Sequence, residues 1–75
     1  MNIKGPDQVL MAGLKEGDKV CVRKIDPMTD LTGEIIHAVY LGLYGNGVML
    51  RFSKNPSECV RVDWRRIAEL RPLNS

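Results

Sequence analysis

Short runs in which apolar and polar residues alternate occupy most of this chain. The clearest run ends in Phe52, where Val48, Leu50 and Phe52 point to one side and Met49 and Arg51 point to the other. A period of two is the period of a strand with one buried face. Residues 19–25 and 58–64 follow the same rule. The side chains predicted to face the core are Val20, Val22, Val48, Leu50, Phe52, Val60, Val62 and Trp64.

The strongest local signal lies between Gly33 and Phe52, where two β-rich runs flank the tripeptide Gly45-Asn46-Gly47. Asn and Gly tolerate positive φ angles, so this tripeptide predicts a β-hairpin closed by a type I′ turn. The other segments rich in turn residues, 26–33 and 53–57, predict loops.

The pattern therefore predicts an all-β fold of five short strands over residues 15–72, followed by a tail at 73–75. Asp63 is placed to cap a 3-10 turn before the last strand, which is expected to stop at Pro72. So many strands in a short chain favour a small closed barrel, because closure removes exposed edges. Residues 1–14 form an N-terminal extension, either a mobile tail or a short helical turn.

If the helical turn forms, it begins at Pro6 and stops at Gly13. Its apolar side chains Val9, Leu10 and Leu14 are then expected to cover an open end of the sheet.

The arrangement of turn glycines and strands resembles the layout of SH3-like small β-barrels. The segments that carry this resemblance are 17–20, 33–35, 47–52, 60–64 and 67–70. Barrels of this kind include the KOW and Tudor modules, the photosystem I E subunit and the type II dihydrofolate reductases. The resemblance implies a module that binds RNA, DNA or a protein segment in a shallow surface groove.

Composition limits the stability, the location and the partners expected of such a module. The chain has 75 residues, one Trp, one Phe and two Tyr, so its core is small and self-association is an economical way to stabilise it. Cys21 and Cys59 form no zinc-binding pattern, and no apolar segment resembles a signal peptide or a membrane span. We expect a cytoplasmic protein that forms a homo-oligomer or binds another protein.

The run from Ile35 to Tyr44 is apolar on both faces, although a small barrel has only one interior. One explanation is that the strand bends at Gly42 and serves both halves of the barrel. The other is that one face contacts a partner. The residues of that predicted interaction surface are Ile36, Tyr40, Tyr44 and Met49.

Basic residues gather in the last third of the chain. From Arg51 onward there are six Lys or Arg against three acids, although the whole chain carries only +2. The alternative function is therefore nucleic-acid binding, with a tyrosine or the edge of Trp64 stacking on a base. An ordinary solvated face, paired with Glu58 and Asp63, explains the same residues. The candidate nucleic-acid-binding residues are Arg51, Arg61, Arg65 and Arg66.

Catalysis has little support in the sequence. His37 is the only histidine, and no catalytic residue, metal ligand, cofactor or small-molecule substrate is expected. The resemblance to type II dihydrofolate reductases implies one exception, an enzyme built by symmetric assembly around a pore. Those proteins carry Val-Gln-Ile-Tyr on the pore strand, where this chain has Val60-Arg61-Val62-Asp63. The glutamine and the tyrosine are absent, so a non-enzymatic binding module remains the main prediction.

Overall fold

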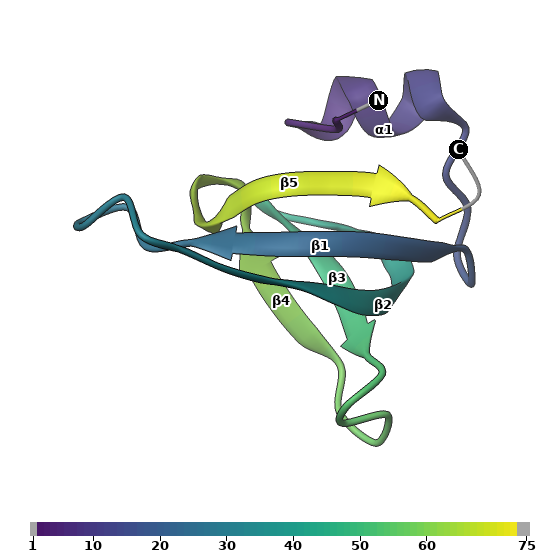
Figure 1. The fold of residues 1–75 in the computed structure, drawn as a ribbon. Coiled ribbons are helices and arrows are strands. Elements are labelled where there is room, and N and C mark those ends of the chain that lie inside the picture. The colour runs from purple at the N-terminus through teal and green to yellow at the C-terminus, as the bar shows by residue number, and fades with distance from the viewer. Residues whose placement is uncertain (1, 74–75) are drawn as a thin grey trace.

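The computed structural model describes residues 2–73 and places them in one antiparallel sheet with a short helix beside it (Figure 1). In chain order the elements are α1 (Pro6–Ala12), β1 (Lys19–Ile25), β2 (Thr32–Tyr44), β3 (Gly47–Phe52), β4 (Val60–Asp63), the 3-10 helix η1 (Trp64–Arg66) and β5 (Ile67–Pro72). The strands lie in the order β4-β3-β2-β1-β5. The prediction of a five-stranded all-β fold with a 3-10 turn before the last strand is confirmed.

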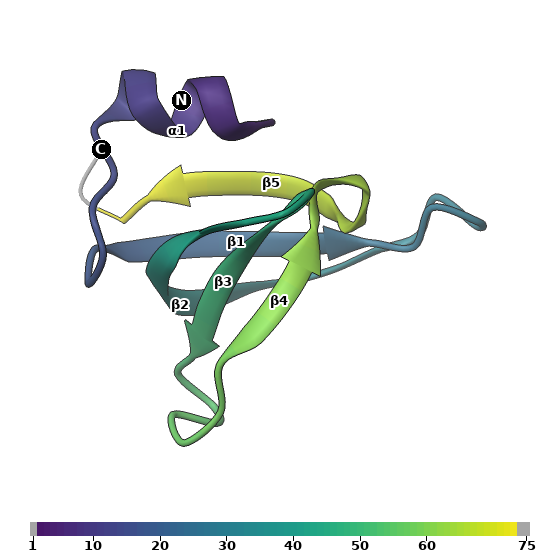
Figure 2. The same cartoon turned by 180° about the vertical axis from the view of Figure 1, so that it is seen from behind.

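Strand β2 holds the two halves of the sheet together. Its first part, 32–39, pairs with β1, and its second part, 38–44, pairs with β3. A β-bulge between Tyr40 and Gly42 shifts the register of the pairing with β3. Gly42 has a φ of 143°, a value that residues with a Cβ atom rarely adopt. The sheet therefore folds over on itself, and β3 and β4 cross β1 and β5 in both views of the ribbon (Figures 1 and 2). This curvature is compatible with a small barrel.

The core lies between the two halves of the folded sheet. The fully or almost fully buried side chains are Ile3, Val9, Val20, Val22, Ala38, Tyr40, Val48, Leu50, Val62 and Leu70. Most predicted core positions are therefore correct. Phe52 and Trp64 are only partly buried. Val60 is 36% exposed, because β4 is an edge strand and no further strand within residues 2–73 covers its outer side.

The β2–β3 turn differs from the predicted type I′ turn. Its two central residues are Gly45 and Asn46, and only Gly45 has a positive φ, at 59°. A positive φ at the first central residue alone is the pattern of a type II′ turn. Gly47 is already part of β3, and its role is in the packing of β3 against β4 rather than in the turn. A Cβ added there would lie 2.5 Å from the backbone oxygen of Val62, so its missing side chain lets β4 approach β3.

The N-terminal extension forms the short helix rather than a tail. Pro6 occupies the first turn of α1, and Gly13 ends it in the left-handed conformation with a φ of 72°. Val9 is buried and Leu14 packs against the core, as expected. Leu10 is 75% exposed, so the expectation that it also covers the sheet was wrong. A helix of two turns can bury only one narrow face.

Candidate binding groove

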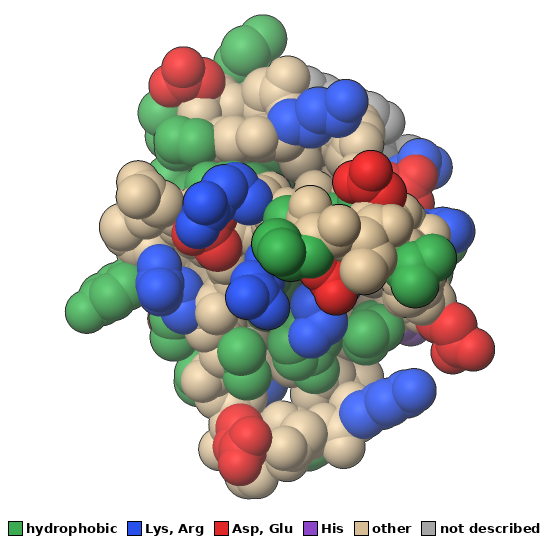
Figure 3. Space-filling model, turned by 90° about the vertical axis from the view of Figure 1, so that its left-hand side faces the viewer, with side chains coloured by type: hydrophobic (Ala, Val, Ile, Leu, Met, Phe, Trp, Pro, Cys, Tyr) green, Lys and Arg blue, Asp and Glu red, His purple; other side chains and the backbone are tan. Residues whose placement is uncertain are grey.

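An open groove of about 630 Å³ lies between the β1–β2 loop and strand β4. Its apolar lining comes from Ile25, Met28, Leu31, Val60 and Val62, and its charged lining comes from Lys24, Asp26, Arg61 and Arg66. Figure 3 looks at the side of the molecule from which the β1–β2 loop projects, and it shows Lys and Arg side chains gathered among hydrophobic ones. The groove combines an apolar surface with an excess of positive charge.

The β1–β2 loop forms one wall and is held by its own hydrogen bonds. The Asp26 carboxylate accepts the Met28 N–H at 2.9 Å, and the Asp26 N–H donates to the Leu31 carbonyl at 2.9 Å. Asp30, with a φ of 58°, turns the chain back and donates its N–H to the Asp26 carbonyl at 2.8 Å. These bonds hold an apolar tip away from the core, with Met28 91% and Leu31 71% exposed.

Strand β4 forms the other wall. Val62 fills the core and Val60 continues the same face toward the groove. Asp63 ends the strand, and its carboxylate accepts the Arg65 N–H at 2.9 Å, which caps η1 as the sequence predicted. That backbone hydrogen bond, helped by the Arg65 guanidinium and by Arg61, holds the pKa of the Asp63 carboxyl below its ordinary value. The capped turn positions Arg66 at the groove.

The groove is electrostatically unbalanced. The ion pairs within residues 2–73 join Glu69 to Arg23 and Arg71, and Asp63 to Arg65. None of these pairs includes the three groove cations, Lys24, Arg61 and Arg66. The Lys24 ammonium instead lies 5.4 Å from the centre of the Phe52 ring, close enough for a cation–π contact. Asp26 is the only acid that lines the groove among the described residues, so the groove favours a ligand with negative charge.

The four candidate arginines do not share one site. Arg61 and Arg66 line the groove. Arg65 pairs with Asp63 at 3.4 Å and lines a separate hollow of about 340 Å³ beside Trp64. Arg51 lies 3.9 Å from the Cys59 sulfur. Sequence reasoning missed Lys24, although its signal was present, because Lys24 continues the inward alternation of Val20 and Val22.

The four residues of the predicted apolar interaction surface lie on two faces. Ile36 and Tyr40 pair with the core residues Val22 and Leu50, and Tyr40 is only 5% exposed. Burial raises the pKa of the Tyr40 phenol. Beyond the bulge the alternation reverses, so Tyr44, which is 65% exposed, lies on the outer face with Met49. The expected continuous patch is therefore not formed, because one extra residue in β2 moves its last residues to the opposite side.

Residues 2–73 contain no group of three or more His, Cys, Asp or Glu side chains that could hold a metal ion. No helix in this part of the chain is long and apolar enough to cross a membrane. Comparison with protein-family models, curated proteins and solved structures found no match to this chain.

Proposed function

We propose that this chain is a non-enzymatic binding module whose groove takes an extended, acidic and apolar segment of a partner protein. The observation that carries the proposal is a set of three cations around an apolar surface, none of which belongs to an ion pair within residues 2–73, in a groove whose loop wall is fixed by hydrogen bonds. Such a surface offers both apolar burial and charge complementarity to an acidic segment.

The fold supports this function by resemblance. The fold agrees with an SH3-like small barrel in the order of its strands along the chain, in the strongly bent β2 and in the 3-10 turn before β5. Barrels of this class bind ligands in shallow surface grooves. Resemblance of fold alone does not define a function, so the groove is the evidence for the proposed function. Cys21 and Cys59 are free thiols, which agrees with the proposal that the protein works in a reducing cytoplasm.

A protein segment fits this groove better than a nucleic acid does. Single-stranded nucleic acids are usually held by a basic track together with aromatic side chains that stack on bases. The described groove lining contains five apolar side chains and no aromatic one, and the arginines that would form the track are divided among three places. Nucleic-acid binding through Arg51, Arg61, Arg65 and Arg66 is therefore the competing outcome of the test.

The test uses fluorescence anisotropy with a labelled seven-residue peptide in which valine and glutamate alternate. The expected result is saturable binding that weakens by at least about tenfold in the double variant Arg61→Glu/Arg66→Glu. Each reversal removes an attraction of up to about 1 kcal/mol and adds a repulsion of similar size. The control variant Lys15→Glu/Lys54→Glu makes the same change of charge at two exposed residues outside the groove lining and is expected to bind as the parent protein does.

Two further probes make the result specific. A peptide in which valine and lysine alternate is expected not to bind, and circular dichroism of the double variant checks that it is folded. The proposal fails if the glutamate peptide does not bind, or if it binds the double variant and the parent equally. Tight binding of a generic single-stranded RNA or DNA oligonucleotide that depends on Arg61 and Arg66 would favour the nucleic-acid function instead.

A further inference from the structure

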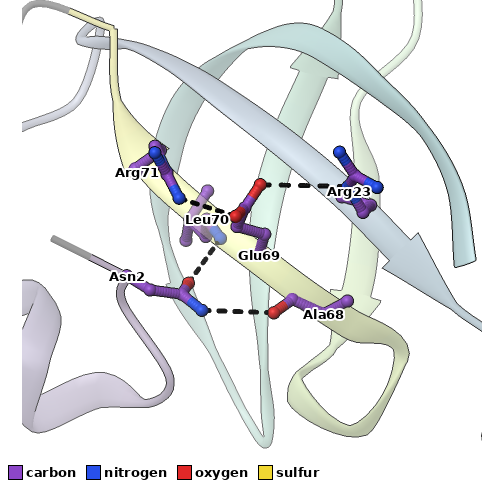
Figure 4. A network of polar contacts seen from close by, with 6 residues as sticks. All are labelled: Asn2, Arg23, Ala68, Glu69, Leu70 and Arg71. Atoms are coloured by element: carbon purple, nitrogen blue, oxygen red, sulfur yellow. Dashed lines mark hydrogen bonds and ion pairs between the residues drawn. The ribbon is translucent and has the colours of Figure 1, made fainter.

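The two edge strands of the sheet, β4 and β5, differ in whether other residues cover their outer edge. The outer edge of β5 is covered by the N-terminal residues (Figure 4). The Asn2 side chain accepts the Leu70 N–H at 2.9 Å and donates to the Ala68 carbonyl at 3.2 Å. The Ile3 N–H donates to the Leu70 carbonyl at 2.7 Å. These contacts occupy the backbone groups with which another strand would pair.

The edge of β4 has no such cover. Within residues 2–73, β3 is the only strand paired with β4. The Trp64 N–H donates to the Asn46 carbonyl at 3.1 Å, directly beyond the paired residues of β3 and β4. This bond shows which residues of β4 direct their backbone groups toward β3. Because hydrogen-bonded residues alternate along an antiparallel ladder, Val60 and Val62 face β3, and the N–H and C=O of Arg61 point away from it. The open edge thus presents the backbone of Arg61.

We propose that the partner segment binds as an added strand on β4, hydrogen-bonded to the backbone of Arg61 and alternating acidic with apolar side chains. This inference rests on the proposed function of the groove and specifies how the groove is occupied. Three consecutive residues of β4 line the groove, so a segment lying in it runs along the open edge. A strand that follows all four residues of β4 covers about 14 Å.

The side-chain pattern follows from the two faces of β4. An added strand continues the sheet, so its side chains point alternately to the inner face beside Val60 and Val62 and to the outer face beside Arg61. The inner positions suit apolar side chains and the outer ones suit acidic side chains. Lys24 and Arg66 strengthen the preference for a segment of net negative charge.

A second copy of the chain is a less favourable occupant. Two β4 strands paired edge to edge would bring two basic grooves together, each with three cations and one acid in its described lining. Like charges at an interface oppose association. An acidic segment removes this repulsion and uses the same open edge.

The test keeps the protein unchanged and modifies the peptide backbone. Two versions of the valine–glutamate peptide are prepared, one N-methylated at each glutamate and one at each valine. In an added strand, alternate N–H groups point to β4 and to solvent, so one version is expected to lose binding by about tenfold or more while the other binds as the parent peptide does. Loss with the glutamate version indicates antiparallel addition, and loss with the valine version indicates parallel addition.

The possible failures are distinguishable. If the unmethylated peptide binds in a way that depends on Arg61 and Arg66, but both methylated versions bind equally well or equally badly, the groove function stands and strand addition is wrong. If no peptide binds, the proposed function itself fails. A dimer of the free protein by light scattering, together with no peptide binding, overturns the proposal in favour of a second copy.

Discussion

Replacing Gly47 by alanine tests how β4 is held at the edge of the sheet. A Cβ at this position would meet the Val62 carbonyl oxygen at 2.5 Å, the Val62 carbonyl carbon at 3.0 Å and the Asp63 Cα at 3.2 Å. All three atoms belong to the backbone of β4, so no side chain can rotate away. An ordinary contact begins near 3.4 Å, and β4 must therefore move by about 0.9 Å, the difference between 3.4 and 2.5 Å.

Such a shift is comparable to overpacking in a core, which costs about 1–3 kcal/mol. For a domain of this size, a loss of about 2 kcal/mol lowers Tm by about 8–16 °C. The matched control is Gly33→Ala, because Gly33 also lies in a strand, has no left-handed φ and has nothing within 4 Å of an added Cβ. We expect Gly33→Ala to leave Tm unchanged or to raise it slightly.

Thermal unfolding followed by circular dichroism measures both variants beside the parent protein. If Gly47→Ala melts at the same temperature as Gly33→Ala, β4 does not approach β3 as closely as the structure shows. Gly47 would then not be the residue that lets β4 pack against β3. Because β4 forms one wall of the groove, we also expect the Gly47→Ala variant to bind the valine–glutamate peptide more weakly than the parent protein does.

Three further changes give distinct readouts. Asn2→Ala removes two partly buried hydrogen bonds to β5, so we expect a loss of about 1–2 kcal/mol in urea unfolding, and no loss would contradict the role of Asn2 as an edge cover. The pKa of the Asp63 carboxyl is lowered in the folded state, so the ionised carboxylate stabilises the folded protein fully above the ordinary pKa of 3.8, and this stabilisation is lost as the pH falls through the lower pKa. The Tm difference between the parent protein and Asp63→Asn should therefore shrink over that range. A constant Tm difference would be inconsistent with this role of Asp63. Met28→Gln changes a side chain that is 91% exposed, so we expect Tm to stay within about 2 °C while peptide binding weakens severalfold, and unchanged binding would remove Met28 from the groove.

The sequence predicted the strands well because their signals are local. Alternation identified Val20, Val22, Val48, Leu50 and Val62 as core residues, since a period of two needs no knowledge of the partner strand. The cap of η1 and the end of α1 were also readable, because each depends on one residue with a specific backbone role.

The predicted surfaces were less accurate because they depend on register. The bulge before Gly42 places Tyr40 in the core and Tyr44 outside, although both occupy even positions of the same run. The groove joins the β1–β2 loop to β4, two segments about thirty residues apart whose proximity comes from the folding of the sheet. Lys24 was overlooked for this reason, because its place at the groove depends on that proximity.

Amide hydrogen exchange of the free protein compares the two edges of the sheet, because an open edge at β4 and a covered edge at β5 predict different exchange rates. We expect the Arg61 N–H to exchange rapidly, near the rate of an unpaired amide, while the N–H groups of Val62 and Leu70 are protected. Addition of the valine–glutamate peptide should then slow exchange at Arg61. If Arg61 is already as protected as Val62 in the free protein, the edge of β4 is not open, and the addition of a partner strand there is wrong.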